Sequence, residues 1–302
     1  MKLLVTGATG MLGTSLSRHF LEKGHEVCGF SRGRISRRPF PKEHLLKGNI
    51  TGKRDMDRIF ESIRPEAVIH AAALSDVDYC EKNPEEASRV NGEGTEAVAK
   101  AARSCGALFC YISSDYVFDG EAREPYREDD PCNPLNAYGK SKLLGEEYAQ
   151  TLSKRYFVIR TSWLFGENKD SFVHHVLEWA KTKKEIHLVA DKWGIPTYTP
   201  DLAEAIHSLF EKNAPSGVYH LTNSGGGCNW FEYGKAVLDY SGLNGITLVP
   251  ISLKNLKLTA KRPQRSVLNH EKFSKVTKRD PRPWQEALKE YLTTAHPAPV
   301  KR

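Results

Sequence analysis

The sequence predicts an α/β fold in which helices cover both faces of a doubly wound parallel sheet, followed by a smaller C-terminal α/β domain. Three observations predict it. Strand-like and helical segments alternate from the N-terminus, the strand-like segments are almost continuously apolar, and a glycine-rich loop joins the first strand to the first helix. This alternation is typical of βαβ units, and apolar strands fit a sheet that is buried on both faces.

The first half of the chain contains the more regular elements. We expect strands at residues 3–6, 26–30, 67–70, 107–112 and 155–160, and helices at residues 11–23, 55–63, 84–104 and 136–152. Pro84, which two glutamates follow, favours a helix start, and Asn136 is an expected N-cap. In the second half, helices are expected at residues 171–181, 200–211, 230–241 and 284–292, and a strand at residues 218–221.

Composition limits the classes of protein and partner. The chain has 302 residues and a formal net charge of +7, and it contains no apolar run of the roughly 18 residues that a membrane helix needs. The six cysteines are scattered, without the spacing of a zinc site or a disulfide framework. We therefore predict a soluble, cytoplasmic protein that binds neither membrane nor nucleic acid and holds no metal. Its positive charge suits an anionic small-molecule ligand.

The glycine-rich loop predicts a dinucleotide site. Gly7, Gly10 and Gly13 follow the first strand and open the first helix, which is the arrangement of a Rossmann dinucleotide-binding domain. The helix N-terminus, with Met11 and Leu12, would present free N–H groups and a positive dipole to a pyrophosphate. We expect Gly10 to adopt an unusual backbone conformation, so that valine there would be excluded.

The end of the second strand predicts which dinucleotide binds. NAD sites often place an acidic residue here, on the ribose 2′-hydroxyl. This chain instead has Ser31 and Arg32, and no acid follows before Glu43. Because an acid would repel a 2′-phosphate and a guanidinium would bind it, we predict NADPH rather than NADH, with one of Arg34, Arg37 or Arg38 assisting Arg32.

A Ser, Tyr and Lys set predicts reduction chemistry. Ser114 follows the fourth strand, and Tyr138 and Lys142 lie four residues apart on one face of the next helix. A nearby ammonium favours the phenolate and lowers the tyrosine pKa, so Tyr138 can exchange a proton with a substrate oxygen while hydride moves. Ser114 would hold the same oxygen by a hydrogen bond. Lys140 is the competing lysine, but at i+2 it faces away from Tyr138.

Together, these motifs resemble the extended short-chain dehydrogenase/reductase superfamily and, within it, the dTDP-4-dehydrorhamnose reductase family. The resemblance covers about residues 3 to 290. It is carried by residues 113–120 (SSDYVFDG), 138–142 (YGKSK) with Gly145 and Glu146, 160–166 (RTSWLFG), 194–203 (GIPTYTPDLA), Arg262 and Pro263 with Ser266, and 284–288 (WQEAL).

The resemblance implies a fold, a reaction and further site residues. Residues 1–165 would form the dinucleotide domain and residues 166–292 mainly an interleaved sugar-nucleotide domain. Independently of the resemblance, the proline- and alanine-rich composition of residues 293–302 predicts a disordered tail. The reaction would be NADPH-dependent reduction of a nucleotide-activated 4-keto-deoxysugar, such as dTDP-4-dehydrorhamnose to dTDP-rhamnose, with Tyr138 as general acid and Lys142 on the nicotinamide ribose. Ala71, Ala72 and Ala73 would line the cofactor cleft, Asn49 and Ile50 would lie at the adenine, and Asp115, Trp163 and Arg262 would bind substrate.

Two alternatives stay open beside this reading. One is a sugar-nucleotide epimerase or dehydratase of the same superfamily, although a dehydratase would need an Asp-Glu pair directly after Ser114, where this chain has Asp115 and Tyr116. The other is a non-catalytic, NADP-binding regulatory subunit that resembles the one of methionine adenosyltransferase. Some bacterial members of the resembling family carry a glutamate for a metal-linked homodimer where this chain has Ser15, which gives such a dimer no support.

Overall fold

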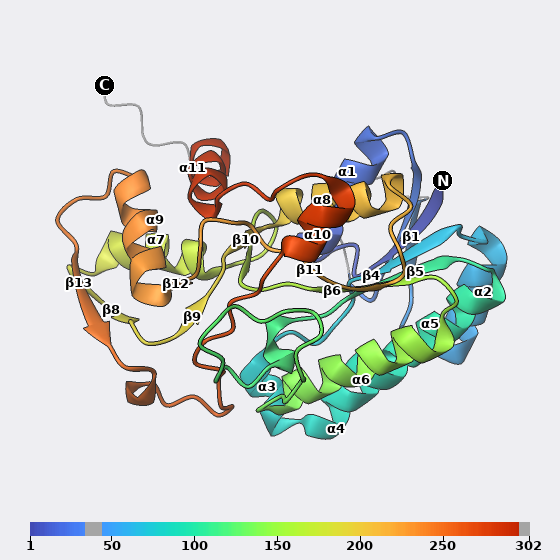
Figure 1. Cartoon of the computed structure of the whole chain (residues 1–302), viewed down its shortest axis with the longest axis horizontal. Coiled ribbons are helices and arrows are strands. Elements are labelled where there is room, and N and C mark those ends of the chain that lie inside the picture. The colour runs from blue at the N-terminus through green and yellow to red at the C-terminus, as the bar shows by residue number, and fades with distance from the viewer. Residues whose placement is uncertain (34–43, 296–302) are drawn as a thin grey trace.

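The computed structural model describes residues 1–33 and 44–295 (Figure 1). Arg34, Arg37 and Arg38, which we expect to assist Arg32, lie outside the described residues, as does the part of the predicted tail after residue 295. The last helix, α11 (Trp284–Ala295), extends three residues past the predicted 292. The prediction of a disordered tail is therefore wrong for residues 293–295.

A seven-stranded parallel sheet forms the centre of the molecule, as the alternating pattern predicts. Its strands are β1 (Lys2–Thr6), β2 (Glu26–Ser31), β3 (Leu45–Lys47), β4 (Ala67–His70), β5 (Leu108–Ile112), β6 (Tyr156–Arg160) and β11 (Gly217–His220). They lie in the order β11-β6-β5-β4-β1-β2-β3, and every neighbouring pair is parallel. Strand order reverses between β1 and β4, and such a switch point opens a crevice at the carboxyl ends of the strands.

Helices cover both faces of this sheet (Figure 1). One face carries α1 (Met11–Glu22), α8 (Thr199–Glu211) and α10 (Glu271–Thr277), and the other carries α2 (Lys53–Ile63), α5 (Gly94–Ser104) and α6 (Ala137–Leu152). Side chains alternate along a strand, so those of β1 contribute to the hydrophobic cores on both faces of the sheet. Leu3 and Val5 pack with Phe20 of α1, and Leu4 packs with Phe60 of α2.

A smaller part of the fold lies beyond the end of the sheet (Figure 1). It contains α7 (Phe172–Thr182), α9 (Trp230–Tyr240) and the parallel pair β8 (Glu185–Val189) and β13 (Thr247–Ile251). Two short pairs connect it to the sheet: β7 (Leu164–Phe165) with β10 (Thr197–Tyr198), and β9 (Trp193–Gly194) with β12 (Cys228–Asn229). Its core is built around Phe165, Tyr233 and Trp284.

The predicted helix at residues 84–104 is not continuous. After a short helix, α3 (Val77–Lys82), the chain forms α4 (Pro84–Ala87), a π-helical turn over Ser88–Glu93, and then α5. Asn91 in this turn accepts a hydrogen bond from the Leu74 amide at 2.8 Å and donates to Ser141 Oγ at 2.9 Å. The π-helical turn thus ties the loop after β4 to helix α6, beside Lys142, and π-helical turns frequently lie at functional sites.

None of the helices within the described ranges has the length and apolar content that crossing a bilayer requires.

Candidate active site

A cleft of about 690 Å³ opens at the carboxyl ends of the strands, at the β1/β4 switch point. Its volume lies within the range of small-molecule sites. It brings together most of the residues that the sequence singled out. The predicted residues along its walls are Gly7, Gly10, Met11, Leu12, Ser31, Arg32, Ile50, Ala71, Ala72, Ala73, Ser114, Asp115, Tyr138, Lys142 and Trp163.

The glycines of the loop meet different demands. Gly7 has φ +67°, and a Cβ on it would lie 2.7 Å from the Ala72 amide nitrogen. A Cβ on Gly13 would collide with the Gly7 carbonyl oxygen. Gly10 has φ −78° and ψ 170°, which any residue adopts, so our expectation of an unusual conformation at Gly10 is wrong. The position that requires glycine is Gly7, because its φ is positive and its backbone lies close to that of Ala71 and Ala72, after β4.

The N-terminus of α1 fits a phosphate group. No side chain caps this helix, and its first turn contains no acidic residue. Met11 and Leu12 lie in this first turn and also line the cleft. Backbone N–H groups of a first helical turn have no partner within the helix, so these donors and the helix dipole are available to an anion in the cleft.

The part of the cleft at the end of β2 carries a positive charge, that of Arg32. Arg32 is exposed, and Ser31 accepts a hydrogen bond from the Gly33 amide at 3.3 Å and lies 2.8 Å from the Thr9 hydroxyl. Asn49 does not line the cleft. Its amide donates to Asp55 Oδ2 at 2.8 Å and its Oδ1 accepts from the Thr51 amide at 3.2 Å, so its described contacts shape the turn before α2.

Ser114, Tyr138 and Lys142 line the same cleft, Ser114 from the segment after β5 and the other two from α6. Asn136 caps α6 as predicted, since its Oδ1 accepts from the Gly139 amide at 2.8 Å. Burial raises the pKa of Tyr138, the charge of Asp115 adds to the shift, and a hydrogen bond with Ser114 opposes it. Tyr138 is therefore a protonated phenol at neutral pH, as a proton donor must be, and our expectation of a lowered tyrosine pKa is wrong.

The two lysines of the motif have different environments. Lys142 is 3% exposed, and its Nζ lies 4.3 Å from the centre of the Tyr111 ring. Burial lowers the pKa of Lys142 to about 7, against the charge of Glu146, which raises it. Lys140 is exposed to solvent. The structure thus places Lys142, and not Lys140, among the residues that line the cleft with Tyr138.

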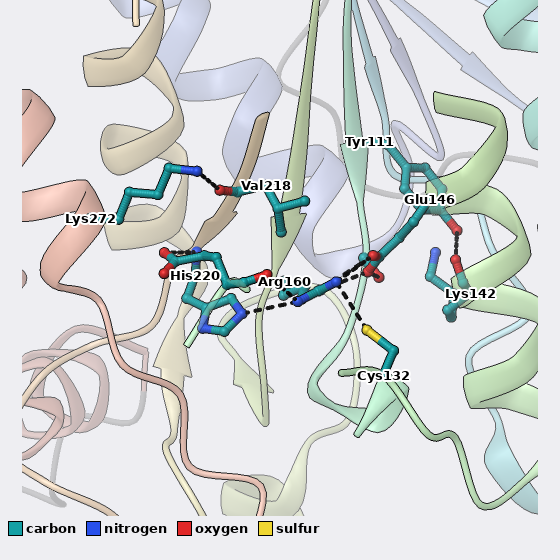
Figure 2. Close-up of polar contacts among 10 residues, drawn as sticks. Tyr111, Cys132, Lys142, Glu146, Arg160, Val218, His220 and Lys272 are labelled. Atoms are coloured by element: carbon teal, nitrogen blue, oxygen red, sulfur yellow. Dashed lines mark hydrogen bonds and ion pairs between the residues drawn. The ribbon is translucent and has the colours of Figure 1, made fainter. Parts of the chain in front are cut away.

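Glu146, four residues after Lys142 on α6, forms a buried ion pair with Arg160 of β6 (Figure 2). Glu146 is fully buried and accepts three hydrogen bonds from Arg160: from Nε to Oε1 at 3.0 Å and to Oε2 at 3.3 Å, and from Nη2 to Oε2 at 2.8 Å. Ser113 Oγ donates to the same carboxylate at 2.5 Å. Burial and Arg160 lower the pKa of His220 to about 3, so its ring is neutral and its Nε2 accepts from Arg160 Nη1 at 3.5 Å.

The predicted substrate residues differ in their placement. Trp163 lines the cleft with φ +45°, a left-handed conformation that costs energy in a residue with a side chain. Its ring packs on Tyr233 at 6.4 Å. Arg262 does not line the cleft: its Nη2 lies 3.0 Å from Asp78 Oδ2, and its guanidinium lies 6.0 Å from the Tyr116 ring centre.

Comparisons with known proteins identify the family. The model of the RmlD substrate binding domain matches residues 1–296. The chain belongs to this family. It is 40% identical over 291 residues to the Bacillus subtilis spore coat polysaccharide biosynthesis protein SpsK, covering 96% of each chain. The predicted family resemblance is thereby confirmed.

Solved structures of dTDP-4-dehydrorhamnose reductases resemble this RmlD-family chain along its length. The Clostridium acetobutylicum enzyme has 36% identity and a TM-score of 0.88, and the alignment covers 98% of this chain and 99% of that one. The Bacillus anthracis enzyme, solved in complex with NADP, has 33% identity and a TM-score of 0.87 over 97% and 99%. These relatives confirm the predicted fold class, and they agree with the predictions of an oxidoreductase and of NADP as its cofactor.

Several residues of this RmlD-family site were missed by sequence reasoning. Lys169, Asp170 and Ser162 also line the cleft, and Lys192 lies fully buried behind its wall. Residues 169 and 170 follow a glycine-containing loop after β7, a strand too short to predict. Lys192 lies only two residues before the recognised segment 194–203, but a lone lysine in a sequence gives no sign that it is buried.

Proposed function

We propose that the chain reduces a nucleotide-activated 4-keto-deoxysugar with NADPH, and that dTDP-4-dehydrorhamnose is the substrate and dTDP-rhamnose the product. One observation carries this proposal: Ser114, Tyr138 and Lys142 line the same cleft as the glycine loop and the uncapped N-terminus of α1. The reductases among its relatives support the sugar-nucleotide class. The relative SpsK carries a different name, which leaves the identity of the sugar to experiment.

The residues of the cleft fit a dinucleotide. The loop at Gly7 leaves no room for a side chain, and the first turn of α1 offers N–H donors without an acid. Arg32 and Ser31 would hold the 2′-phosphate, Ala71–Ala73 would flank the cofactor, and Ile50 and Asn49 would lie towards the adenine. When bound, the nicotinamide supplies the hydride that the reduction needs.

The chain's own residues would handle the proton. Tyr138 donates its phenolic proton to the C4 oxygen as the carbonyl becomes an alcohol, and the resulting phenolate later takes a proton from solvent. Lys142 stabilises that phenolate through its charge and binds the nicotinamide ribose. Ser114 and Tyr138 together orient the C4 oxygen, while Trp163 and Asp115 shape the sugar side of the site, and Arg262, outside the cleft wall, would act through Tyr116.

We also propose that the two parts of the fold bind different ligands. The sheet and its helices, mainly residues 1–165 with later segments such as β11 and α8, would bind the dinucleotide. The smaller part, within residues 166–292, would bind the sugar nucleotide. Support comes from the cleft itself, because its walls include both the glycine loop and Trp163, Lys169 and Asp170.

A cofactor-preference experiment tests the dinucleotide half of the site. Arg32→Asp is expected to shift the kcat/KM ratio of NADPH to NADH towards NADH by about tenfold to a hundredfold, because a carboxylate repels the 2′-phosphate and accepts from a 2′-hydroxyl. Arg54→Asp, at an exposed arginine of α2 outside the cleft, makes the same charge change and should leave the ratio unaltered. An unchanged ratio in Arg32→Asp would reject Arg32 as the determinant.

A substrate screen tests the reaction. NADPH oxidation is measured with dTDP-4-dehydrorhamnose and with 4-keto sugars on other nucleotides, and the product is identified. Turnover of NADPH with dTDP-4-dehydrorhamnose is the expected result. Interconversion of sugar nucleotides without net NADPH use would favour an epimerase. Cofactor binding without turnover on any sugar nucleotide would favour a regulatory subunit.

A further inference from the structure

A loop from the smaller part of the fold connects two walls of the cleft. Residues 166–171 lead from β7 to α7, and Lys169 of this loop lines the cleft. At the start of the loop, a Cβ on Gly166 would lie 3.7 Å from Met11 Cγ, in the first turn of α1. Three residues later, Lys169 Nζ donates to Ser75 Oγ at 3.3 Å. The loop therefore runs from the segment after β1 to the segment after β4, which are the two sides of the switch point.

Contacts along its first half hold the backbone of this loop. The Gly166 carbonyl oxygen accepts a hydrogen bond from the Tyr291 hydroxyl at 3.1 Å. Glu167 Oε2 lies 3.0 Å from Arg18 Nη2 of α1. Asn168 has φ +71°, a left-handed conformation that asparagine adopts more readily than most residues. The chain thus reaches the next residue, the lysine, along a backbone that the rest of the fold already positions.

The charge of Lys169 is not balanced by a neighbouring anion. In the part of the chain that the structure describes, its ammonium group forms no ion pair, and the Ser75 hydroxyl that accepts from it is neutral. The adjacent carboxylate, that of Asp170, lies 3.4 Å from His174 Nε2 of α7 instead. Lys169 is also exposed, so its ammonium group can exchange the weak bond to Ser75 for an anionic ligand without a desolvation cost on burial.

The position of Lys169 favours a diphosphate as that ligand. Arg32 and Lys142, the other positive groups on the described cleft wall, are assigned to the 2′-phosphate and the nicotinamide ribose. In a doubly wound fold, a dinucleotide crosses the sheet at the switch point and places its pyrophosphate at the N-terminus of the first helix. The loop that carries Lys169 connects the two sides of this crossing, from Met11 to Ser75. A lysine ammonium binds phosphate oxygens as a point charge.

We propose that Lys169 binds the pyrophosphate of NADPH together with the N-terminus of α1, and that a phosphate oxygen replaces Ser75 as the acceptor of its hydrogen bond. This inference rests on the proposed function, since it assumes NADPH in this cleft. It gives the smaller part of the fold, which we assign mainly to the sugar nucleotide, a contact with the cofactor. A sugar nucleotide also carries a diphosphate, so the experiment has to distinguish the two sources.

The test compares the wild-type full chain with Lys169→Met for three ligands: NADPH, 2′-AMP and dTDP. 2′-AMP has the 2′-phosphate of the cofactor but no pyrophosphate, and dTDP carries the diphosphate of the sugar nucleotide. We expect the Kd of NADPH to rise about tenfold, as for the loss of one hydrogen bond to a charged group, and the other two Kd values to change by less than about twofold. The tenfold difference should shrink between about 0.05 and 0.5 M salt, because an exposed charge is screened.

Two further variants separate the contact from general damage. Lys169→Arg keeps the positive charge and should keep the NADPH Kd within about threefold of wild type. Lys212→Met removes an exposed lysine at the end of α8, outside the cleft, and should leave all three Kd values unaltered.

Three results would overturn the proposal: an NADPH Kd of Lys169→Met within about twofold of wild type at low salt, an equal loss for 2′-AMP, or a loss for dTDP as large as that for NADPH. None of these measurements needs turnover. A wild-type chain that binds no NADPH would overturn the proposed function and this inference together, whereas equal NADPH binding by wild type and Lys169→Met would overturn this inference alone.

Discussion

Tyr138→Phe is expected to slow single-turnover oxidation of NADPH by about 10² to 10⁴, the usual contribution of a positioned proton donor. The substitution removes only the hydroxyl, and the ring keeps its edge contact with Tyr116 at 5.7 Å. NADPH binding, measured by fluorescence titration, should stay within about twofold of wild type. Rapid-quench or stopped-flow measurement with the best 4-keto sugar nucleotide from the screen gives the rate of the chemical step.

Lys142→Met should behave differently, because Lys142 is assigned both the ribose contact and the stabilisation of the phenolate. We expect weaker NADPH binding together with a slower chemical step. Lys140→Met is the matched control: the same substitution two residues away, at an exposed lysine on another face of α6, should alter neither. Near wild-type turnover by Tyr138→Phe would show that Tyr138 is not the acid, and a regulatory role would then gain most.

The sequence was sufficient to predict the sheet and most of the cleft. Apolar strands and helices with one apolar face repeat with little interruption up to residue 160, and their period reflects burial on two faces. The motif residues could be predicted to meet, because Gly7, Ala72 and Ser114 all follow strands of one parallel sheet, and such strands end at one edge. The roles assigned to these residues remain predictions until variants are measured.

Other features depend on contacts between distant segments. β7, β9, β10 and β12 are two residues each, so no periodicity can reveal them, and β8 and β13 pair although α8, β11 and α9 lie between them in the chain. The π-helical turn at Ser88–Glu93 is stabilised by bonds from Asn91 to the Leu74 and Ser141 segments, which no local pattern contains. Arg262, predicted from its place in the family pattern, is paired with Asp78, 184 positions earlier in the chain.

Removing one partner of the buried ion pair between Glu146 and Arg160 is expected to destabilise the protein strongly. Glu146→Gln keeps the shape of the side chain but leaves the guanidinium of Arg160, 4% exposed, without its anion. Breaking such a pair typically costs about 3 to 5 kcal/mol, since the remaining charge stays buried and uncompensated. Urea unfolding of the cofactor-free protein at neutral pH measures the loss. Asp239→Asn, which breaks an exposed pair with Lys235 on α9, should cost only about 0.2 to 0.5 kcal/mol.

Glu146→Gln should also change how the affinity for NADPH depends on pH. The charge of Glu146 is the largest influence that raises the pKa of Lys142, which burial lowers to about 7. Without that charge, the Lys142 pKa falls further, so the ammonium form persists only at lower pH. NADPH affinity of Glu146→Gln should therefore be weaker than wild type near pH 7 and approach the wild-type value as pH is lowered through the new pKa. A loss of affinity that is equal at every pH would mean that Glu146 acts on the fold alone and not on the charge of Lys142.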